Sequence, residues 1–284
     1  MSILITDLEV KRGQRDVIRG LNLSVAPGEL VAVIGANGAG KSTLLGALAG
    51  DLPYTAGSIS LDNRPVVEWT PKALARRRAV LRQSPRLDLR FSVLEVVLMG
   101  RTPHLRRHES LSDLRIARAA LELVDLTGFE ARVYPELSGG EQQRVHLARV
   151  LAQVWNPAIE GTPDTDDRPS AYLLLDEPTA NLDVLAQHSV LRCARRFAES
   201  GGAVLCVLHD INLAAQYADR VVLLAGGVAI ADGPPNQVLT PARLHQTFSV
   251  NSTIIRPAEL AHPVIVAEPR LHPTPTPKED TAHE

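Results

Sequence analysis

Nine consecutive residues of this sequence have the types and the order that bind phosphate. They are Gly35, Ala36, Asn37, Gly38, Ala39, Gly40, Lys41, Ser42 and Thr43, and the first eight fit the pattern G-x-x-x-x-G-K-[ST]. Glycine lets the backbone wrap closely, so that successive N–H groups and the start of the following helix point at β- and γ-phosphates. Lys41 adds a positive charge there, and the Ser42 hydroxyl is placed to hold Mg²⁺. The segment therefore predicts a site for the phosphates of a nucleotide.

Two acidic residues end an apolar run further along the chain. Residues 172–175 are Tyr-Leu-Leu-Leu, and Asp176 and Glu177 follow them. An α/β sheet binds its ligand at the carboxyl edge of its strands, where both acids are expected. Beside a phosphate loop, Asp176 fits the acid on the Mg²⁺ side, and Glu177 fits the residue that orients and polarises the attacking water.

A third element is the start of a helical pattern. Ser138, Gly139 and Gly140 precede the helical run that begins at Glu141. Ser138 is a favourable helix cap, and the free N–H groups of a helix N-terminus bind anions. Taken alone, this segment is equally well explained as a capped helix start.

One of the nine histidines stands at a functional place in the pattern. His209 directly follows the apolar run 203–208, so that its ring is expected at the same sheet edge as Asp176 and Glu177. The other histidines, such as His146 and His188, are interpreted as structural.

The order of apolar runs predicts the elements that position these groups. Short β-like runs alternate with turns at the N-terminus, helical periodicity dominates from about residue 83 to residue 152, and strand-like and helix-like runs then alternate. This alternation predicts a mostly parallel sheet with crossover helices, and so an α/β fold. The expected strands are 3–10, 17–25, 30–34, 57–61, 171–175, 203–208, 221–224 and 228–231, and the expected helices are 42–49, 71–78, 93–99, 114–126, 140–151, 211–217 and 241–248.

The remaining composition narrows the class of protein. The net charge of −2 gives no global basic field for nucleic acid, and Arg76, Arg77 and Arg78 are interpreted as a solvated face of one short helix. Cys193, in a helical pattern, and Cys206, in an apolar run, are expected to be reduced and packed. No apolar run is long enough to span a membrane and no signal-peptide pattern opens the chain, so residence in the cytosol is expected.

The sequence contains, in this order, the phosphate loop, Gln83, the segment Leu137-Ser138-Gly139-Gly140-Glu141, the acidic strand end, Asn181-Leu182-Asp183 and His209. This order resembles that of the ABC ATPase family. The resemblance implies a P-loop NTPase (RecA-like) core, an N-terminal antiparallel β part and an inserted helical subdomain. Domain bounds of 2–255 are expected, with the helical subdomain at about 84–152, an exposed loop at 156–170 and a disordered tail at 268–284.

The resemblance also implies roles and partners. Gln83 corresponds to a glutamine that reaches Mg²⁺ and links ATP to a transmembrane partner, Asp183 to an aspartate that crosses a dimer interface, and His209 to a histidine near the γ-phosphate. ATP and Mg²⁺ are the implied cofactors. Each element occurs once per chain, so that two copies related by a twofold axis are needed to complete two sites. The Ser138 and Gly140 N–H groups of one copy would then contact the γ-phosphate held by the other.

The sequence departs from the family pattern at the position that would stack on the adenine base. The family usually stacks adenine on an aromatic residue in the first β-rich segment, yet no aromatic residue precedes Tyr54. The expected position falls near Arg12, whose planar guanidinium either stacks on the base or is a solvated turn residue.

Local features resemble importers in particular. Residues 79–83, 91–93 and 100–104 are similar to ATPases that serve importers of iron chelates, haem and cobalamin, and the Pro/Asp-rich insert after Trp155 looks like that of the haemin-importer ATPases. This resemblance implies two partners, a permease dimer and, indirectly, a periplasmic haem-binding protein. It also implies a peripheral location on the cytoplasmic face of the inner membrane. Siderophore or cobalamin import and a soluble, non-transport ABC ATPase remain the alternatives.

Overall fold

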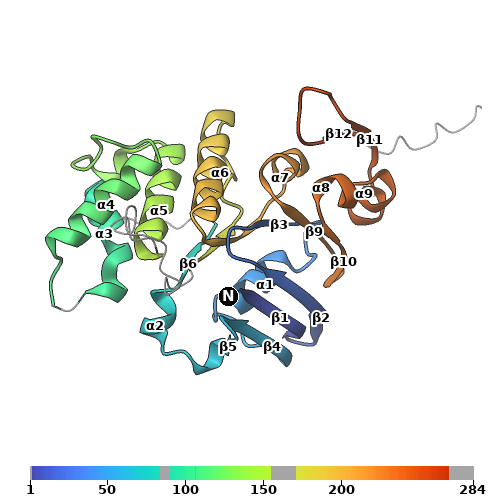
Figure 1. Ribbon diagram of the computed structural model, residues 1–284, viewed down its shortest axis with the longest axis horizontal. Coiled ribbons are helices and arrows are strands. Elements are labelled where there is room, and N and C mark those ends of the chain that lie inside the picture. Colours follow the sequence, from blue (N-terminus) through green and yellow to red (C-terminus); the bar gives the residue numbers. More distant parts are fainter. Residues whose placement is uncertain (1, 84–89, 106, 155–170, 269–284) are drawn as a thin grey trace, which may run out of the picture.

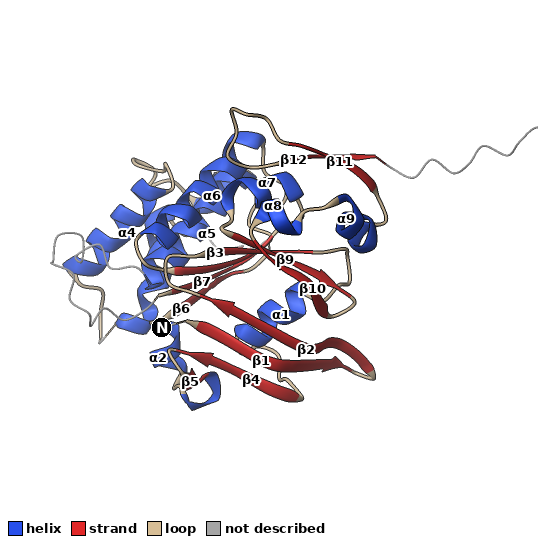
Figure 2. Cartoon of the chain, turned by 45° about the vertical axis from the view of Figure 1, so that its right-hand side comes forward, coloured by secondary structure: helices blue, strands red, loops and turns tan. Residues whose placement is uncertain are grey.

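Two β-sheets face each other across a single helix (Figure 2). The computed structural model describes residues 2–83, 90–105, 107–154 and 171–268. The smaller sheet is antiparallel, with strand order β2-β1-β4-β5. Its strands are β1 (Ile3–Arg12), β2 (Arg15–Val25), β4 (Ala56–Leu61) and β5 (Arg64–Pro65). The expected N-terminal antiparallel part is thus confirmed.

The larger sheet has six strands in the order β10-β9-β3-β8-β7-β6. All neighbours pair in parallel except β9 and β10, which form an antiparallel hairpin at one edge. The expected mostly parallel sheet is therefore confirmed. Its strands are β3 (Leu30–Ile34), β6 (Arg78–Leu81), β7 (Tyr172–Asp176), β8 (Ala203–Val207), β9 (Arg220–Ala225) and β10 (Val228–Gly233).

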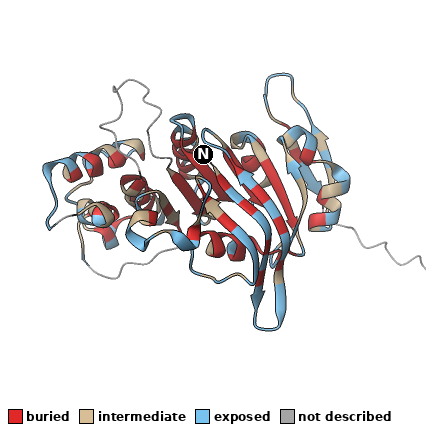
Figure 3. Ribbon diagram, turned by 60° about the horizontal axis from the view of Figure 1, so that its bottom comes forward, coloured by how far each residue is buried: buried red, intermediate tan, exposed pale blue. Residues whose placement is uncertain are grey.

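The central strands are buried on both faces, which explains their unbroken apolar runs. Leu30, Ala32 and Ile34 of β3 face one core, whereas Val31 and Val33 face the other. Helix α1 (Lys41–Leu48) lies in the second core, between the two sheets. Helices α5 (Gly139–Val154), α6 (Val184–Glu199) and α7 (Ile211–Tyr217) cover the other face. Figure 3 shows the buried residues concentrated along these strands.

The expected helical insert lies at one end of the molecule (Figure 1). Helices α3 and α4 both begin with a capping box, Ser92 with Glu95 and Ser110 with Asp113, which explains where these helices start. The elements are α3 (Val93–Leu98), the 3₁₀ helix η2 (Met99–His104), α4 (Leu111–Leu123), the 3₁₀ helix η3 (Tyr134–Glu136) and α5. The insert at 156–170, predicted to be an exposed loop, lies outside the described residues.

One expected helix is too long in the prediction. Helix α2 covers only Pro71–Ala75, with a 3₁₀ turn η1 (Val66–Glu68) before it, and Arg78 begins strand β6 instead of ending the helix. The interpretation of the arginine run as one solvated face is also wrong. Arg78 is directed inward and its guanidinium binds the carbonyls of Leu48 and Ala49 at the end of α1. Pairing with β7 and this capping role override the local helical pattern.

The packed chain continues past residue 255. Helices α8 (Pro235–Val238) and α9 (Pro241–Phe248) lead to the hairpin of β11 (Asn251–Ile255) and β12 (Val264–Glu268). Asn212 of α7 exchanges two hydrogen bonds with the backbone of Ile265, at 2.7 and 3.1 Å. The hairpin is therefore held on the core, whereas the tail that was expected to be disordered lies, from residue 269 on, outside the described chain.

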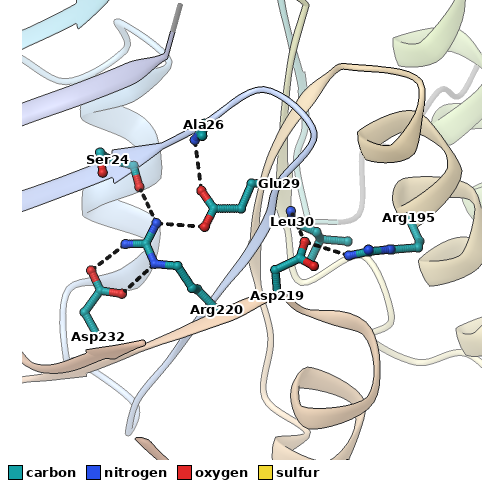
Figure 4. Close-up of polar contacts among 8 residues, drawn as sticks. All are labelled: Ser24, Ala26, Glu29, Leu30, Arg195, Asp219, Arg220 and Asp232. Atoms are coloured by element: carbon teal, nitrogen blue, oxygen red, sulfur yellow. Dashed lines mark hydrogen bonds and ion pairs between the residues drawn. The ribbon is translucent and has the colours of Figure 1, made fainter. Parts of the chain in front are cut away.

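A polar network joins the two sheets at the edge where the parallel strands begin (Figure 4). Arg220 of β9 binds Glu29 at 2.8 Å, Asp232 at 2.7 Å and the carbonyl of Ser24 at 3.2 Å. Beside it, Asp219 accepts from the Leu30 N–H and from Arg195 of α6. The network holds the first residues of β3 and β9 against β2 and α6. The candidate site residues lie at the opposite edge, where the parallel strands end.

Neither cysteine belongs to a reactive site. Cys193 and Cys206 are free and buried, and burial raises the pKa of both thiols, that of Cys193 to about 12. The expectation of reduced, packed thiols is confirmed. Within the described residues, no helix has the length and apolar character that a membrane span requires.

A buried ion pair in the helical part gives a testable stability effect. Arg101 Nε lies 2.9 Å from Asp113 Oδ1, and both side chains are at most 10% exposed. Although burial opposes it, hydrogen bonds from Ser110 and Arg101 lower the pKa of Asp113 to about 2. Compared with the ordinary value of 3.8, this depressed pKa corresponds to roughly 2 kcal/mol of stability.

We expect Asp113→Asn to lower the free energy of unfolding by about 2 kcal/mol or more at pH 7, because it leaves the Arg101 charge buried without its partner. The folded-state pKa is depressed, so the contribution is complete above about pH 5 and is lost as the pH falls from about 4 to 2. Urea midpoints at pH 7, 5 and 3.5 test this sign. A wild-type advantage that grew on acidification would contradict it.

Candidate functional site

The glycine loop between β3 and α1 is held by close backbone approaches that only glycine permits. A Cβ on Gly35 would lie 2.2 Å from the Leu224 carbonyl oxygen, and one on Gly40 would lie 2.8 Å from Ile18 Cδ1. Gly38 and Gly40 also have positive φ, at 78° and 108°. Within the described chain, no side chain caps α1. Its N-terminus is thus shaped and left available for an anion.

Lys41 points into the loop that precedes it. Its Nζ donates to the carbonyls of Gly35 at 2.7 Å and Ala36 at 3.1 Å, and the residue is only 5% exposed. Burial lowers the pKa of this ammonium, while Glu177 and Asp176 oppose the shift. The charge therefore stands inside the loop, where phosphate oxygens would replace water.

The two strand-end acids differ in their surroundings. Asp176 ends β7 and accepts a hydrogen bond from Ser42 Oγ at 3.4 Å. Burial, and next the charge of Glu177, raise the pKa of Asp176. A cation bound between Asp176 and Ser42 would favour the ionised carboxylate, which is the environment expected of a Mg²⁺ ligand.

Glu177 is held by two of the residues that the sequence pointed to. Gln83 Nε2 donates to Glu177 Oε2 at 2.7 Å, and His209 Nε2 lies 2.5 Å from Oε1. Glu177 has a φ of 49°, an unusual value for a side chain of this size. The Glu177 side chain is 12% exposed, and the two residues that hold it come from segments far from it in the sequence. In this structure the amide of Gln83 faces Glu177 rather than the Ser42–Asp176 pair.

The start of α5 is a capping box. Glu141 N–H donates to Ser138 Oγ at 3.3 Å, and Ser138 N–H donates to Glu141 Oε2 at 2.8 Å. The Ser138 N–H, which was expected to contact phosphate, is thus bonded within its own chain. A Cβ on Gly139 would meet nothing within 4 Å, so that the first turn of α5 faces open space. This turn could receive an anion from outside the chain.

Asp183 lies next to this helix start. Its carboxylate caps α6 by accepting from Ala186 N–H at 2.8 Å. A Cβ on Gly140 would contact Ala186 Cβ at 3.6 Å, so the starts of α5 and α6 are neighbours. Val184 and Leu185, which follow Asp183, are 70% and 75% exposed. Two adjacent apolar side chains with this exposure, beside the starts of two helices, fit a protein contact surface.

Arg12 does not contact the other candidate residues through any interaction that the structure describes. It is exposed at the end of β1, beside the tight turn that leads into β2. Both readings of Arg12, base stacking and a solvated turn residue, are compatible with this place.

The sequence did not reveal what braces the glycine loop. The turn between β9 and β10 contacts it, because Gly227 N–H donates to the Ala39 carbonyl at 3.1 Å and Gly227 O accepts from Arg19 N–H at 2.9 Å. A Cβ on Gly227 would lie 2.2 Å from the Val17 carbonyl. The signal for this turn in the sequence is the adjacent pair Gly226-Gly227, which is typical of a turn but does not identify the segment that the turn contacts.

Comparison with known proteins places the chain in a family. A family model described as ABC transporter matches residues 18–157. The hemin import ATP-binding protein HmuV of Gloeobacter violaceus is 48% identical over 257 residues, which cover 90% of both chains. The protein of the same name from Myxococcus xanthus is 44% identical and covers 97% of this chain and all of its own.

Solved structures agree on the fold. A chain of an ABC transporter assigned to the metal-chelate type, in an inward-facing conformation, aligns with a TM-score of 0.77 and 26% identity, covering 94% of this chain and 97% of that one. A dimeric bacterial ABC transporter cassette aligns at 0.68 and 26%, covering 82% and 98%. From the loop geometry, the helical insert and these relatives together, the chain is a member of the ABC transporter ATP-binding protein family, whose members are ATPases.

Proposed function

We propose that the chain is the ATP-hydrolysing subunit of an importer that carries hemin through a membrane permease. The observation that carries the catalytic part is Glu177, held between Gln83 and His209 beside the phosphate loop. The relatives named for hemin import, 44–48% identical over most of the chain, support the substrate. Together they favour an import ATPase that acts as a homodimer with a permease dimer at the cytoplasmic face of the inner membrane.

The chemistry follows from the positions of the side chains. The loop N–H groups and Lys41 bind the β- and γ-phosphates, and Glu177 orients a water and accepts its proton as the water attacks the γ-phosphate. His209 and Gln83 hold the carboxylate in place, so that little reorganisation is needed in the transition state. Ser42 and Asp176 fit a Mg²⁺ ion, which would offset the charge that develops on the phosphate oxygens.

Each chain offers two different half-sites. The phosphate loop holds the nucleotide, and the open turn at Gly139 is available for the γ-phosphate of a second copy. A twofold dimer completes both sites at once, with Asp183 and the exposed Val184 and Leu185 in the contact surface. ATP favours the closed dimer and hydrolysis releases it, which gives the permease a cycle of two states.

The substrate is tested with the assembled system. The chain, its permease and a periplasmic binding protein are reconstituted in vesicles, and ATP hydrolysis is measured with the binding protein free, loaded with hemin, loaded with a ferric siderophore, or loaded with cobalamin. We expect stimulation by the hemin-loaded protein. Stimulation by another ligand alone would reassign the substrate, and hydrolysis that never responds to any permease would favour a soluble ATPase.

A further inference from the structure

The C-terminal end of α5 is fixed by the 3₁₀ helix η2. Arg101 Nη1 donates to the Ala152 carbonyl at 2.7 Å, and His104 Nε2 lies 2.7 Å from the Gln153 carbonyl oxygen. Both acceptors belong to the last turn of α5, whose carbonyls have no partner inside the helix. A Cβ on Gly100 would lie 2.1 Å from the Arg149 carbonyl, so η2 is pressed against the α5 backbone. The helix that begins at the Ser138 cap is therefore held firmly at its far end.

The side chain of Gln153 carries this end of α5 to the core of the ATPase. Its Nε2 donates to the carbonyl of Ala75 at 2.8 Å and to that of Arg78 at 3.1 Å. Ala75 is the last residue of α2 and Arg78 is the first of β6. One amide group thus connects the helical insert to the parallel sheet.

Arg78 extends the connection to α1. Its guanidinium binds the carbonyl oxygens of Leu48 and, at 2.5 Å, Ala49, which form the C-terminal end of α1. Burial lowers the pKa of Arg78 to about 10, so the group stays charged at neutral pH. A cation at a helix C-terminus is favourable and rigidly placed when it binds two carbonyls.

The two helices linked in this way are those whose N-termini form the two half-sites. Helix α1 starts at the phosphate loop, and α5 starts at the Ser138 cap. From the contacts above we infer that Gln153 and Arg78 form a tie that sets the relative orientation of the two half-sites within one chain. Both are positioning residues, because their side chains contact backbone carbonyls at the ends of helices and strands rather than the phosphate loop or the Ser138 turn.

The tie matters because a twofold dimer must close two sites at the same time. The loop of each copy meets the serine-headed helix of the other, so the angle between α1 and α5 within a chain decides whether both contacts form together. Misplacement by about 1 Å can cost about a hundredfold in rate. A second contact supports the tie, since Arg76 Nε donates to the Pro103 carbonyl at 2.9 Å.

Gln153→Met tests the tie, because methionine keeps the length of the side chain but cannot donate. This inference rests on the proposed function, and it predicts that the two steps of the reaction respond differently. ATP affinity of the open monomer should change by less than about twofold, whereas kcat should fall about tenfold, the effect of roughly two ordinary hydrogen bonds. In protein that also carries Glu177→Gln, the dissociation constant of the ATP-bound dimer should rise about tenfold.

Arg243→Met is the matched control, because it also removes two side-chain hydrogen bonds to the backbone, those to Gln237 at 2.6 Å and Val238 at 3.4 Å. It lies on α9, remote from the tie, so kcat should stay near wild type for a similar loss of thermal stability. Gln153→Glu keeps the shape of the side chain but places a carboxylate against two carbonyl oxygens. Its kcat and its ATP-dependent dimerisation should be at least as impaired as those of Gln153→Met.

Two results would overturn the tie. The first is a Gln153→Met protein whose kcat and dissociation constant of the ATP-bound dimer match those of Arg243→Met. The second is a Gln153→Glu protein with normal turnover, because this would mean that Gln153 acts through packing and not through its hydrogen bonds. Failure of the proposed function looks different, since the unsubstituted chain would then not hydrolyse ATP or form the ATP-dependent dimer. If Gln153→Met does not fold, the Gln153→Glu measurements decide alone.

Discussion

Glu177→Gln is expected to bind ATP normally and to hydrolyse it roughly 10³-fold more slowly, since a positioned general base contributes about 10²–10⁴-fold. Glutamine has the same shape and can still bond Gln83 or His209, but it cannot accept the proton of the attacking water. The phosphate loop and Lys41 are unchanged, so ATP stays bound and the closed dimer should accumulate. Size-exclusion chromatography with ATP and a phosphate-release assay on purified protein measure the two effects.

The control for this substitution is Glu199→Gln on α6, which removes the same charge from an exposed pair with Arg195, 3.0 Å away. It should leave turnover near wild type. Near-normal hydrolysis by Glu177→Gln would remove Glu177 from the chemistry. A protein that neither hydrolyses nor binds ATP would instead mean that the Glu177 carboxylate supports the fold of the loop, through its contacts with Gln83 and His209.

Ser138→Arg is expected to abolish hydrolysis while leaving the affinity of the open monomer for ATP unchanged within about twofold. The phosphate loop of the same chain is untouched, but a long charged side chain now fills the open turn at Gly139. The other copy can no longer bring its γ-phosphate to this turn, and the loss should exceed about 10²-fold, the effect of one missing transition-state donor. Nucleotide titration by fluorescence and a turnover assay separate the two quantities.

Loss of the helix cap accompanies this change and must be separated from it. Ser138→Ala also breaks the capping box, at a cost of about 1 kcal/mol, but adds no bulk. We expect Ser138→Ala to keep ATP-dependent dimerisation and part of its turnover. Equal loss of activity in both variants would show that the cap, rather than access to the turn, is what the reaction requires.

The candidate site was recognised from the sequence because its chemistry depends on local order. A glycine loop with Lys41, a strand that ends in two acids and a serine-headed helix are each defined by neighbouring residues. The buried strands and the helices that alternate with them follow the same logic, since buried parallel strands must be apolar throughout. Helix α2 was overestimated because Arg78 is drawn into β6 by pairing with Tyr172, a residue 94 positions away.

Contacts between distant segments could not be predicted in this way. The family resemblance implied that Gln83 reaches Mg²⁺, but only the fold shows its amide bonded to Glu177. The sequence identified Ser138 as a cap, but not that its N–H is used by Glu141.

By itself the sequence determined the family, the phosphate-binding loop and the alternation of strands and helices, because short-range backbone geometry and burial periodicity impose these on neighbouring residues. Tertiary structure alone decided how Glu177 is held, how the Gly226–Gly227 turn braces the loop and how Gln153 and Arg78 join α1 to α5. These depend on hydrogen bonds between carbonyls and side chains far apart in the chain. No pattern of residue types records which carbonyl a distant side chain will meet, since every residue carries the same acceptor.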